Sequence, residues 1–396
     1  MRSRQFALLC GVGLFAFISY NLIRMPLLPL FAQSLGAGPE AIGFIVAAST
    51  LTGVFLKWPA GAFSDIYDRR WLLLVGLLAF ALPPFGYLLI SDVGWLVPLR
   101  FIHGTATAVF APIAMAAVAD VFREARGVAL GSYTAATQGG AMLGPLLGGW
   151  LMLSAGFPAA FVTAGALGSI AFLLFLLLRL PPQVPPAAAG VGLGAVLKDM
   201  VRGARTVVGN VRVLVTSATD GARQVANGAL MAFLPIYVVG IGHDAVQAGV
   251  LFGVQSVTSF VSRPTMGWAS DRIGRRPLIL LGLVVCAGSL AAIPFTVPFL
   301  GLMVLSALFG FGEAIVNASA AALVADLSEL KTLGSAMGMQ GAIMDIGHAS
   351  GPILAGVLIG AVGFQTAFPI IAGVVLLAAA GFKAAVGGEQ PAGAVA

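Results

Sequence analysis

Long apolar runs alternate along this chain with short breaks that hold most of its charged residues. A helix needs about 20 consecutive apolar residues to cross the hydrocarbon core of a bilayer. The runs reach about that length, so the pattern predicts an all-α integral membrane protein with twelve spans. The predicted spans are residues 6–32, 41–63, 71–91, 95–120, 127–153, 158–179, 213–239, 245–263, 277–297, 299–326, 334–360 and 364–386.

The composition supports a lipid-facing surface. Hydrophobic residues make up 59% of the 396 positions and charged residues only 9%, whereas a soluble protein carries about a quarter charged residues. The basic, then apolar N-terminus resembles a signal peptide, but it lacks a small-x-small cleavage site and stays apolar to about Phe31. We therefore expect an uncleaved first span.

The basic residues fall on one side of the predicted spans. Of the 21 lysines and arginines, 18 lie in the breaks of one side or at the adjoining span ends, and the breaks of the other side hold none. The positive-inside rule then places both termini and the central loop in the cytoplasm and requires an even number of spans. These clusters account for the net charge of +6, so we do not expect nucleic-acid binding. Short loops are typical of a bacterial inner membrane protein.

The sequence repeats itself after about half its length, at an offset of 206 residues that becomes 207 after one inserted residue. Such a repeat predicts two parallel six-helix bundles, at 1–180 and 213–396. The segment between them, 181–212, is Pro-rich and then basic, and it is either a helix on the membrane surface or a flexible tether. The matches include Asn21 with Asn227, Lys57 with Arg263, Asp65 with Asp271, Asp120 with Asp326, Gly144 with Gly351 and Pro145 with Pro352.

The loops after the second and eighth spans share a charged pattern, "GAFSDIYDRR" from Gly61 and "GWASDRIGRRP" from Gly267. Arginines here can pair with acids at the ends of the fourth and tenth spans and hold one state of the protein closed. The simpler alternative is that they are only positive-inside charges. The candidate gate residues are Gly61, Asp65, Arg69, Arg70, Asp120, Gly267, Asp271, Arg272, Arg275, Arg276 and Asp326.

Twelve spans in two parallel halves with these loops resemble the major facilitator superfamily. The family pattern G-x-x-x-D-(R/K)-x-G-R-(R/K) is complete in the second loop, whereas the first has Ile66 for the basic residue and Asp68 for the glycine. The resemblance covers nearly the whole chain. It implies a secondary transporter that rocks its two halves around a central site.

The fifth span holds an unusual number of glycines, in "GSYTAATQGGAMLGPLLGG" from Gly131 to Gly149. Glycines at a spacing of four allow a second helix to approach at backbone distance, and a proline permits a kink. The pattern resembles that of twelve-span drug:proton antiporters, and we expect a pliable seam between the halves; plain helix packing is the alternative. The seam candidates are Gly131, Gly140, Gly144, Pro145, Gly148 and Gly149.

Ionisable residues inside a membrane are costly and mark functional sites. We expect Glu313 or Asp345, both near the midplane, to carry a proton, and Asp220 to pair with Arg223 as a structural pair. The antiporter resemblance, through "RFIHG" from Arg100, implies a role for this arginine in proton transfer, whereas His103 is either a cavity residue or a packing residue. Proton-coupling candidates are Glu313, Asp345, Arg100, His348 and Asp220. Substrate-cavity candidates are Asn21, Arg24, His103, Gln138, Arg223, Gln224, Asn227, Asn317 and Gln340.

The resemblance of the fifth span to the antiporters implies proton-coupled efflux of an amphiphilic solute, and we expect a monomer. Two buried arginines, Arg24 and Arg100, keep open a carrier of small organic anions, whereas Glu313 and Asp345 favour cations. A non-transporting sensor is a remote third hypothesis. We expect no metal site, because the two cysteines and three histidines lack a ligand spacing. We expect neither an enzyme nor a cofactor, because the sequence contains no catalytic constellation and no nucleotide-binding loop.

Overall fold

A computed structural model describes residues 2–66, 68–122, 125–178, 209–329 and 332–386. Nearly all of the predicted linker, with its surface helix or tether, lies outside these residues. The described chain is helical and contains no strand. Its elements are α1 (Arg2–Leu22), η1 (Ile23–Leu27), α2 (Leu28–Ser34), α3 (Pro39–Ile66), α4 (Arg69–Ala81), α5 (Pro83–Gly86), η2 (Tyr87–Leu89), η3 (Val93–Trp95), α6 (Leu96–Val121), α7 (Arg126–Leu176), α9 (Val211–Gly240), α10 (Ala245–Ile273), α11 (Arg275–Ala292), η6 (Ile293–Phe295), α12 (Phe299–Asp326), α13 (Leu333–Val362) and α14 (Phe364–Val386).

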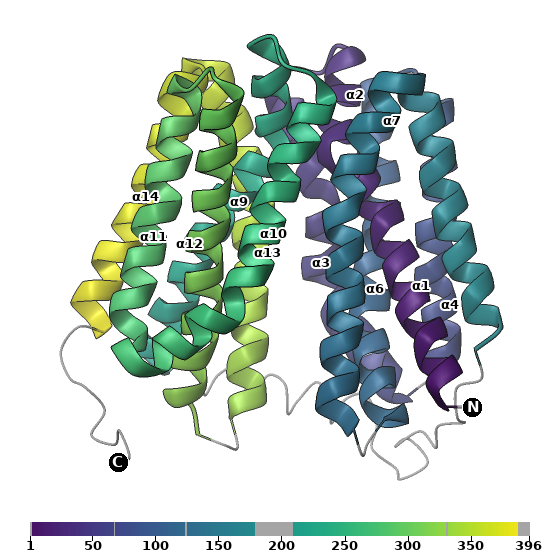
Figure 1. The fold of residues 1–396 in the computed structure, drawn as a ribbon, viewed down its shortest axis with the longest axis horizontal. Coiled ribbons are helices and arrows are strands. Elements are labelled where there is room, and N and C mark those ends of the chain that lie inside the picture. The colour runs from purple at the N-terminus through teal and green to yellow at the C-terminus, as the bar shows by residue number, and fades with distance from the viewer. Residues whose placement is uncertain (1, 67, 123–124, 179–208, 330–331, 387–396) are drawn as a thin grey trace.

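The helices stand side by side in two groups (Figure 1). We call α1 to α7 the first half and α9 to α14 the second half. Helix α1 begins and α14 ends at the same end of the molecule, the lower end in Figure 1, which we call the base. The opposite end is the top, where α3 and α10 begin.

Eleven described helices are long and apolar enough to cross a membrane, and α7 contains two spans. Its 51 residues would extend about 75 Å as one straight helix, far more than a bilayer of about 30 Å. Gly156 interrupts the helix with φ +78°, which other residues rarely adopt. The two arms pack on different helices, Gly148 against Leu22 of α1 and Gly168 against Phe80 of α4. The twelve-span prediction is therefore confirmed, and the protein is an integral membrane protein.

Two helices are longer than their apolar runs. The predicted second and eighth spans end at residues 63 and 263, but α3 continues to Ile66 and α10 to Ile273. Backbone hydrogen bonds carry a helix through polar residues as readily as through apolar ones, so hydropathy marks the ends of lipid contact only. Lys57 and Arg263 therefore lie inside helices and not at helix ends, where the sequence had placed them.

The glycines of the fifth span bring α7 against α1. A Cβ atom at Gly144 would lie 2.8 Å from Asn21 Cβ, and one at Gly140 would lie 2.6 Å from the Leu14 carbonyl oxygen. The predicted backbone-distance packing is confirmed. The stripe of Gly140, Gly144 and Gly148 packs on α1 within the first half, so these three glycines do not lie between the halves. Two other seam candidates do: a Cβ at Gly149 would meet Ala245 of α10, and the Pro145 carbonyl lies against Gly249 of α10.

The two halves meet near the top through two symmetric glycine contacts. A Cβ atom at Gly43 of α3 would clash with the carbonyl oxygen of Pro352 in α13, and one at Gly249 of α10 with that of Pro145 in α7. One large apolar cluster contains side chains of both halves. A second cluster, from α1, α4, α6 and α7, belongs to the first half alone. The halves are therefore closed against each other at the top.

Replacing Gly144 by alanine should destabilise the protein, because the added methyl group meets α1 backbone atoms. Overpacking of this kind costs roughly 1–3 kcal/mol. The matched control is Gly131→Ala in the same helix, where nothing lies within 4 Å of the added Cβ. Thermal unfolding in detergent, followed by tryptophan fluorescence, should show a lower melting temperature for Gly144→Ala only. Equal melting temperatures would contradict the close approach of α7 and α1.

Candidate functional site

A polar cavity of about 210 Å³ lies between the two halves. Its first-half side comes from α1, η1 and α7, and its second-half side from α9, α10, α12 and α13. The wall contains four ionisable side chains and four amides, so it is far more polar than the surrounding membrane core. The ionisable side chains are Arg24, Arg263, Glu313 and His348, and the amides are Asn21, Gln138, Asn227 and Gln255.

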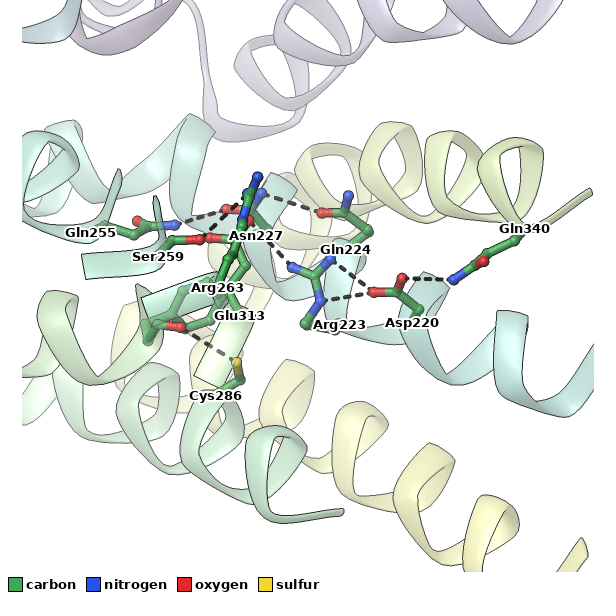
Figure 2. Close-up of polar contacts among 11 residues, drawn as sticks. Asp220, Arg223, Gln224, Asn227, Gln255, Ser259, Arg263, Cys286, Glu313 and Gln340 are labelled. Atoms are coloured by element: carbon green, nitrogen blue, oxygen red, sulfur yellow. Dashed lines mark hydrogen bonds and ion pairs between the residues drawn. The ribbon is translucent and has the colours of Figure 1, made fainter. Parts of the chain in front are cut away.

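A buried charge cluster in the second half lies behind the cavity wall (Figure 2). The Arg223 guanidinium is fully buried and lies 2.8 Å from Asp220 Oδ1 and 3.6 Å from Glu313 Oε1. Gln340 donates to the other oxygen of Asp220 at 3.4 Å. The predicted pairing of Asp220 with Arg223 is confirmed. One buried cation thus holds two acids, and the second of them, Glu313, reaches the cavity.

A chain of amides ties α10 to α9 at the cavity wall. Gln255 donates to Asn227 Oδ1 at 3.1 Å, and Asn227 donates to Gln224 Oε1 at 3.3 Å (Figure 2). The cavity residues Gln255, Ser259 and Arg263 were missed from the sequence as a site. Their spacing of four residues places them on one helix face, which is the signal that would have found them.

Two polar contacts join the halves below the top. Arg24 Nη2 lies 2.6 Å from His348 Nε2, and Lys57 Nζ lies 2.6 Å from Asp345 Oδ2. A guanidinium only donates hydrogen bonds, so His348 Nε2 accepts here, and its imidazole is neutral in this conformation. Asp345 does not line the cavity. Its carboxylate forms an ion pair with Lys57, which was not among the predicted site residues.

Arg100 and His103 lie in the core of the first half. Both side chains are fully buried, Arg100 donates to Ser49 Oγ, and His103 Nδ1 lies 3.3 Å from the Tyr87 hydroxyl. The Tyr20 ring lies 5.8 Å from the guanidinium carbons of both Arg24 and Arg100, which is within the range of cation–π attraction. The Tyr20 ring therefore lies between Arg100 and the cavity residue Arg24.

The structure brings together some of the predicted site residues and separates others. Among the described residues, the predicted candidates that line the cavity are Asn21, Arg24, Gln138, Asn227, Glu313 and His348. Those that lie elsewhere are Arg100, His103, Asp220, Arg223, Gln224, Asn317, Gln340 and Asp345. Five of these eight contact one of the charged or amide side chains described above: Arg223, Asp220, Gln340, Gln224 and Asp345.

At the base, the predicted pairs of basic and acidic residues are confirmed. Arg69 pairs with Asp120 between α4 and α6, and Arg275 Nε lies 2.6 Å from Asp326 Oδ2 between α11 and α12. Each pair joins helices of one half, so it braces that half rather than tying the two together. In the part of the chain that the structure describes, nothing lies within 4 Å of a Cβ at Gly267, so none of its helices approaches this glycine closely.

Other members of the predicted gate vary in their surroundings. Arg70 donates to the Leu178 carbonyl at 2.8 Å, Asp271 lies 3.5 Å from Arg275, and Arg272 lies over the Trp268 ring. The side chains of Gly61 and Asp65 lie outside the described part of the chain.

An apolar groove of about 460 Å³ adjoins the polar cavity. It runs between α7 and α10 and is lined by side chains such as Leu146 and Val254. Leu143 and Val257 in its wall are exposed on the outer surface, so the groove opens toward the lipid. Met142 lines both the groove and the polar cavity. The two spaces therefore adjoin at Met142, one polar and one apolar.

Comparison with known proteins gives one consistent family. The family model described as Major Facilitator Superfamily matches residues 9–253 and 221–393. The chain is 28% identical over 367 residues to the "Multidrug resistance protein MdtG" of Citrobacter koseri, covering 89% of this chain and 87% of that protein. It is 29% identical over 369 residues to the MdtG of Enterobacter lignolyticus, with 89% and 85% covered.

Two solved structures share the fold. A bacterial homolog of the human lysosomal transporter Spinster, in an inward-facing and occupied conformation, has a TM-score of 0.80 at 15% identity and 99% coverage of both chains. The nucleoside transporter NupG has a TM-score of 0.76 at 16% identity, with 97% of this chain and 100% of that chain covered. At such low identity these likenesses concern the fold alone.

Removing the buried cation should destabilise the protein more than removing a cation at the base. Arg223→Met leaves Asp220 and Glu313 without a counter-charge in the membrane core, which costs about 3–5 kcal/mol. Arg275→Met breaks the half-exposed pair with Asp326, which costs about 0–1 kcal/mol. Melting temperatures in detergent should separate the two variants clearly. Adding Asp220→Asn and Glu313→Gln to Arg223→Met should recover much of the loss; similar losses in the two arginine variants would contradict the buried cluster.

Proposed function

The chain belongs to the major facilitator superfamily of secondary transporters, and from this premise we propose that it exports amphiphilic, drug-like solutes in exchange for protons. The observation that carries the proposal is a polar cavity with one acid, Glu313, beside an apolar groove that opens toward the lipid. The multidrug resistance proteins that it resembles support efflux as the direction.

The two adjoining spaces support an amphiphilic solute. Drug-sized ligands need pockets of about 300–1,000 Å³, and the polar cavity alone provides about 210 Å³. The apolar groove adds about 460 Å³ and shares Met142 with the cavity. A solute with a polar head in the cavity and an apolar tail in the groove fits both linings.

Glu313 is the best candidate for the proton. It is the one acid among the described cavity residues, and the 3.6 Å distance to Arg223 leaves its carboxylate without a short hydrogen bond to that guanidinium. Asp345 is occupied by Lys57, and Asp220 is buried behind the wall. A proton and a polar solute group that both use Glu313 exclude each other, which is the requirement for exchange.

The basic loops support an orientation with the base in the cytoplasm. The top contacts at Gly43 and Gly249 then close the outer side, and the conformation is inward-facing. In this state the cavity is ready to receive a solute from the cytoplasm or from the lipid. We place the protein in a bacterial inner membrane.

A second candidate function is transport of small organic anions. It is favoured by Arg24 and Arg263, which line the cavity without forming an ion pair to any described carboxylate. An anion carrier would use both guanidinium groups and would not need the apolar groove.

The proton exchange is tested in everted membrane vesicles that are acidic inside, with a fluorescent pH probe. Adding lipophilic amphiphiles should collapse the gradient, and Glu313→Gln should abolish that response because the carrier of the proton is lost. The matched control is Glu329→Gln, at an exposed acid near the base, which should leave the response unchanged. Full activity of Glu313→Gln would remove Glu313 as the proton carrier.

The same vesicles separate the other functions. A response to small organic anions alone, dependent on Arg24 and Arg263, would favour the anion carrier. No change of the pH gradient with any solute class would overturn transport.

The groove is tested by filling it. In Gly253→Leu the new side chain starts 3.2 Å from Leu146 and occupies space meant for an apolar tail. For two solutes with one head group, the variant should raise KM about tenfold for the long-tailed solute only, because excluding two methylenes costs about 1.6 kcal/mol at about 0.8 kcal/mol per CH₂. Gly288→Leu, at a site with nothing within 4 Å, is the control. An equal effect on both solutes would argue against the groove as a tail site.

A further inference from the structure

One ion pair between the halves has a counterpart in the other repeat that keeps the cation and lacks the acid. Lys57 of α3 pairs with Asp345 of α13 at 2.6 Å. The repeat offset of 206 residues carries Lys57 onto Arg263, and the offset of 207 carries Gln138 onto Asp345. The symmetric counterpart of the Lys57–Asp345 pair is therefore Arg263 with Gln138. The cation is kept, and the acid is replaced by an uncharged amide.

Arg263 consequently forms no ion pair with a carboxylate of the described residues. Both Arg263 and Gln138 line the polar cavity. The one side-chain hydrogen bond of Arg263 in the described chain is long, 3.5 Å to Ser259 Oγ, and its buried Nε has no partner. Buried donors without partners are costly, so this position favours an acceptor that comes with the solute.

The remaining cavity charges decide which kind of acceptor fits. Arg24 adds a second cation, whose contact is the neutral His348 and whose Nε also has no partner. Glu313, on α12, adds one negative charge to the same cavity. A simple anion would be repelled by Glu313, and a simple cation would be repelled by the two arginines. Charges of both signs within one small cavity best complement a solute that carries both.

We propose that the cavity is a two-charge site for the head of a zwitterionic amphiphile. The acidic group of the solute binds Arg263 on the side of Gln138, its ammonium group binds Glu313, and its apolar part lies in the groove between α7 and α10. This inference rests on the proposed function for the direction of transport. It also supplies the reason for exchange, since the ammonium group and a proton compete for Glu313.

Three dansyl compounds that differ only in charge test the site. Dansyl-lysine, labelled on its side-chain amine, is a zwitterion; dansylcadaverine is the same molecule without the carboxylate, and dansyl-ε-aminocaproic acid is the same molecule without the ammonium. Binding is measured by dansyl fluorescence with the full chain in nanodiscs, after subtraction of protein-free nanodiscs and without any gradient. Dansyl-lysine should bind at least about tenfold more tightly than either relative, because each charge-assisted hydrogen bond is worth about that much.

Three variants assign the charges to residues. Arg263→Gln should remove the advantage of dansyl-lysine over dansylcadaverine, and Glu313→Gln its advantage over dansyl-ε-aminocaproic acid. Gln138→Glu keeps Arg263 but gives it an internal acid, as Lys57 has, and should weaken dansyl-lysine as much as Arg263→Gln does while sparing dansylcadaverine. Arg212→Gln, at an exposed arginine near the base, should leave the ranking unchanged. Retained binding of dansylcadaverine shows that Arg263→Gln and Gln138→Glu are folded, and retained binding of dansyl-ε-aminocaproic acid shows the same for Glu313→Gln.

Two kinds of result in the binding affinities of the three dansyl compounds would overturn the proposal. If dansyl-ε-aminocaproic acid binds as tightly as dansyl-lysine, Glu313 does not bind an ammonium group and the site is one for anions. If dansylcadaverine binds most tightly, or if Gln138→Glu leaves dansyl-lysine unaffected, Arg263 does not bind an acid. Because this is equilibrium binding, a failure of proton exchange in vesicles would not alter the ranking, and the two proposals fail separately.

Discussion

The close approach of glycine backbone to proline carbonyls near the top is the contact on which the rest of the arrangement depends. Lipid gives helices no hydrophobic reason to associate, so association depends on packing at short range and on polar contacts. Gly43 against Pro352 and Gly249 against Pro145 bring the two halves within backbone distance at two symmetric points. With the top fixed in this way, the side chains just below it enclose the polar cavity. A Cβ at either glycine would separate the halves where the cavity has to be sealed.

The charges beneath this contact are arranged so that burial is tolerated. Isolated charges in a membrane core are costly, and they persist when they face one another or a water-filled space. Arg223 pairs with both Asp220 and Glu313. Lys57 pairs with Asp345 across the two halves. The first pairing holds the cavity acid to a helix of its own half, whereas the second exists only while the halves are in contact. The stable cluster and the separable pair therefore have different roles in a rocking motion.

The sequence predicts the number of helices, the repeat and the local ion pairs, because each depends on residues close in sequence or on a repeated pattern. The division at residues 180 and 213 stays a prediction. The sequence also predicts the wrong partner for the glycine stripe of α7. A smooth helix face shows that another helix packs closely against it, but it does not show which helix. The sequence misses Arg263 as a cavity residue as well, since hydropathy ends the eighth span there while the hydrogen-bonded helix continues to Ile273. Contacts between distant helices are set by three-dimensional packing, which composition does not record.

The two repeats share their packing residues and the ion-pair residues at the base, but they differ in the charges at the cavity. The physical reason lies in what each kind of residue does. Both halves need a helix that approaches another at backbone distance, so Gly144 and Gly351 meet the same steric demand, against α1 and against α9. The cavity lies between the halves and is shared, so its charges need to occur only once. A second acid at Gln138 would satisfy Arg263 internally and leave it nothing to offer a solute. Divergence at this single position therefore converts a symmetric pair of bridges between the halves into one bridge, at Lys57, and one open binding group, at Arg263.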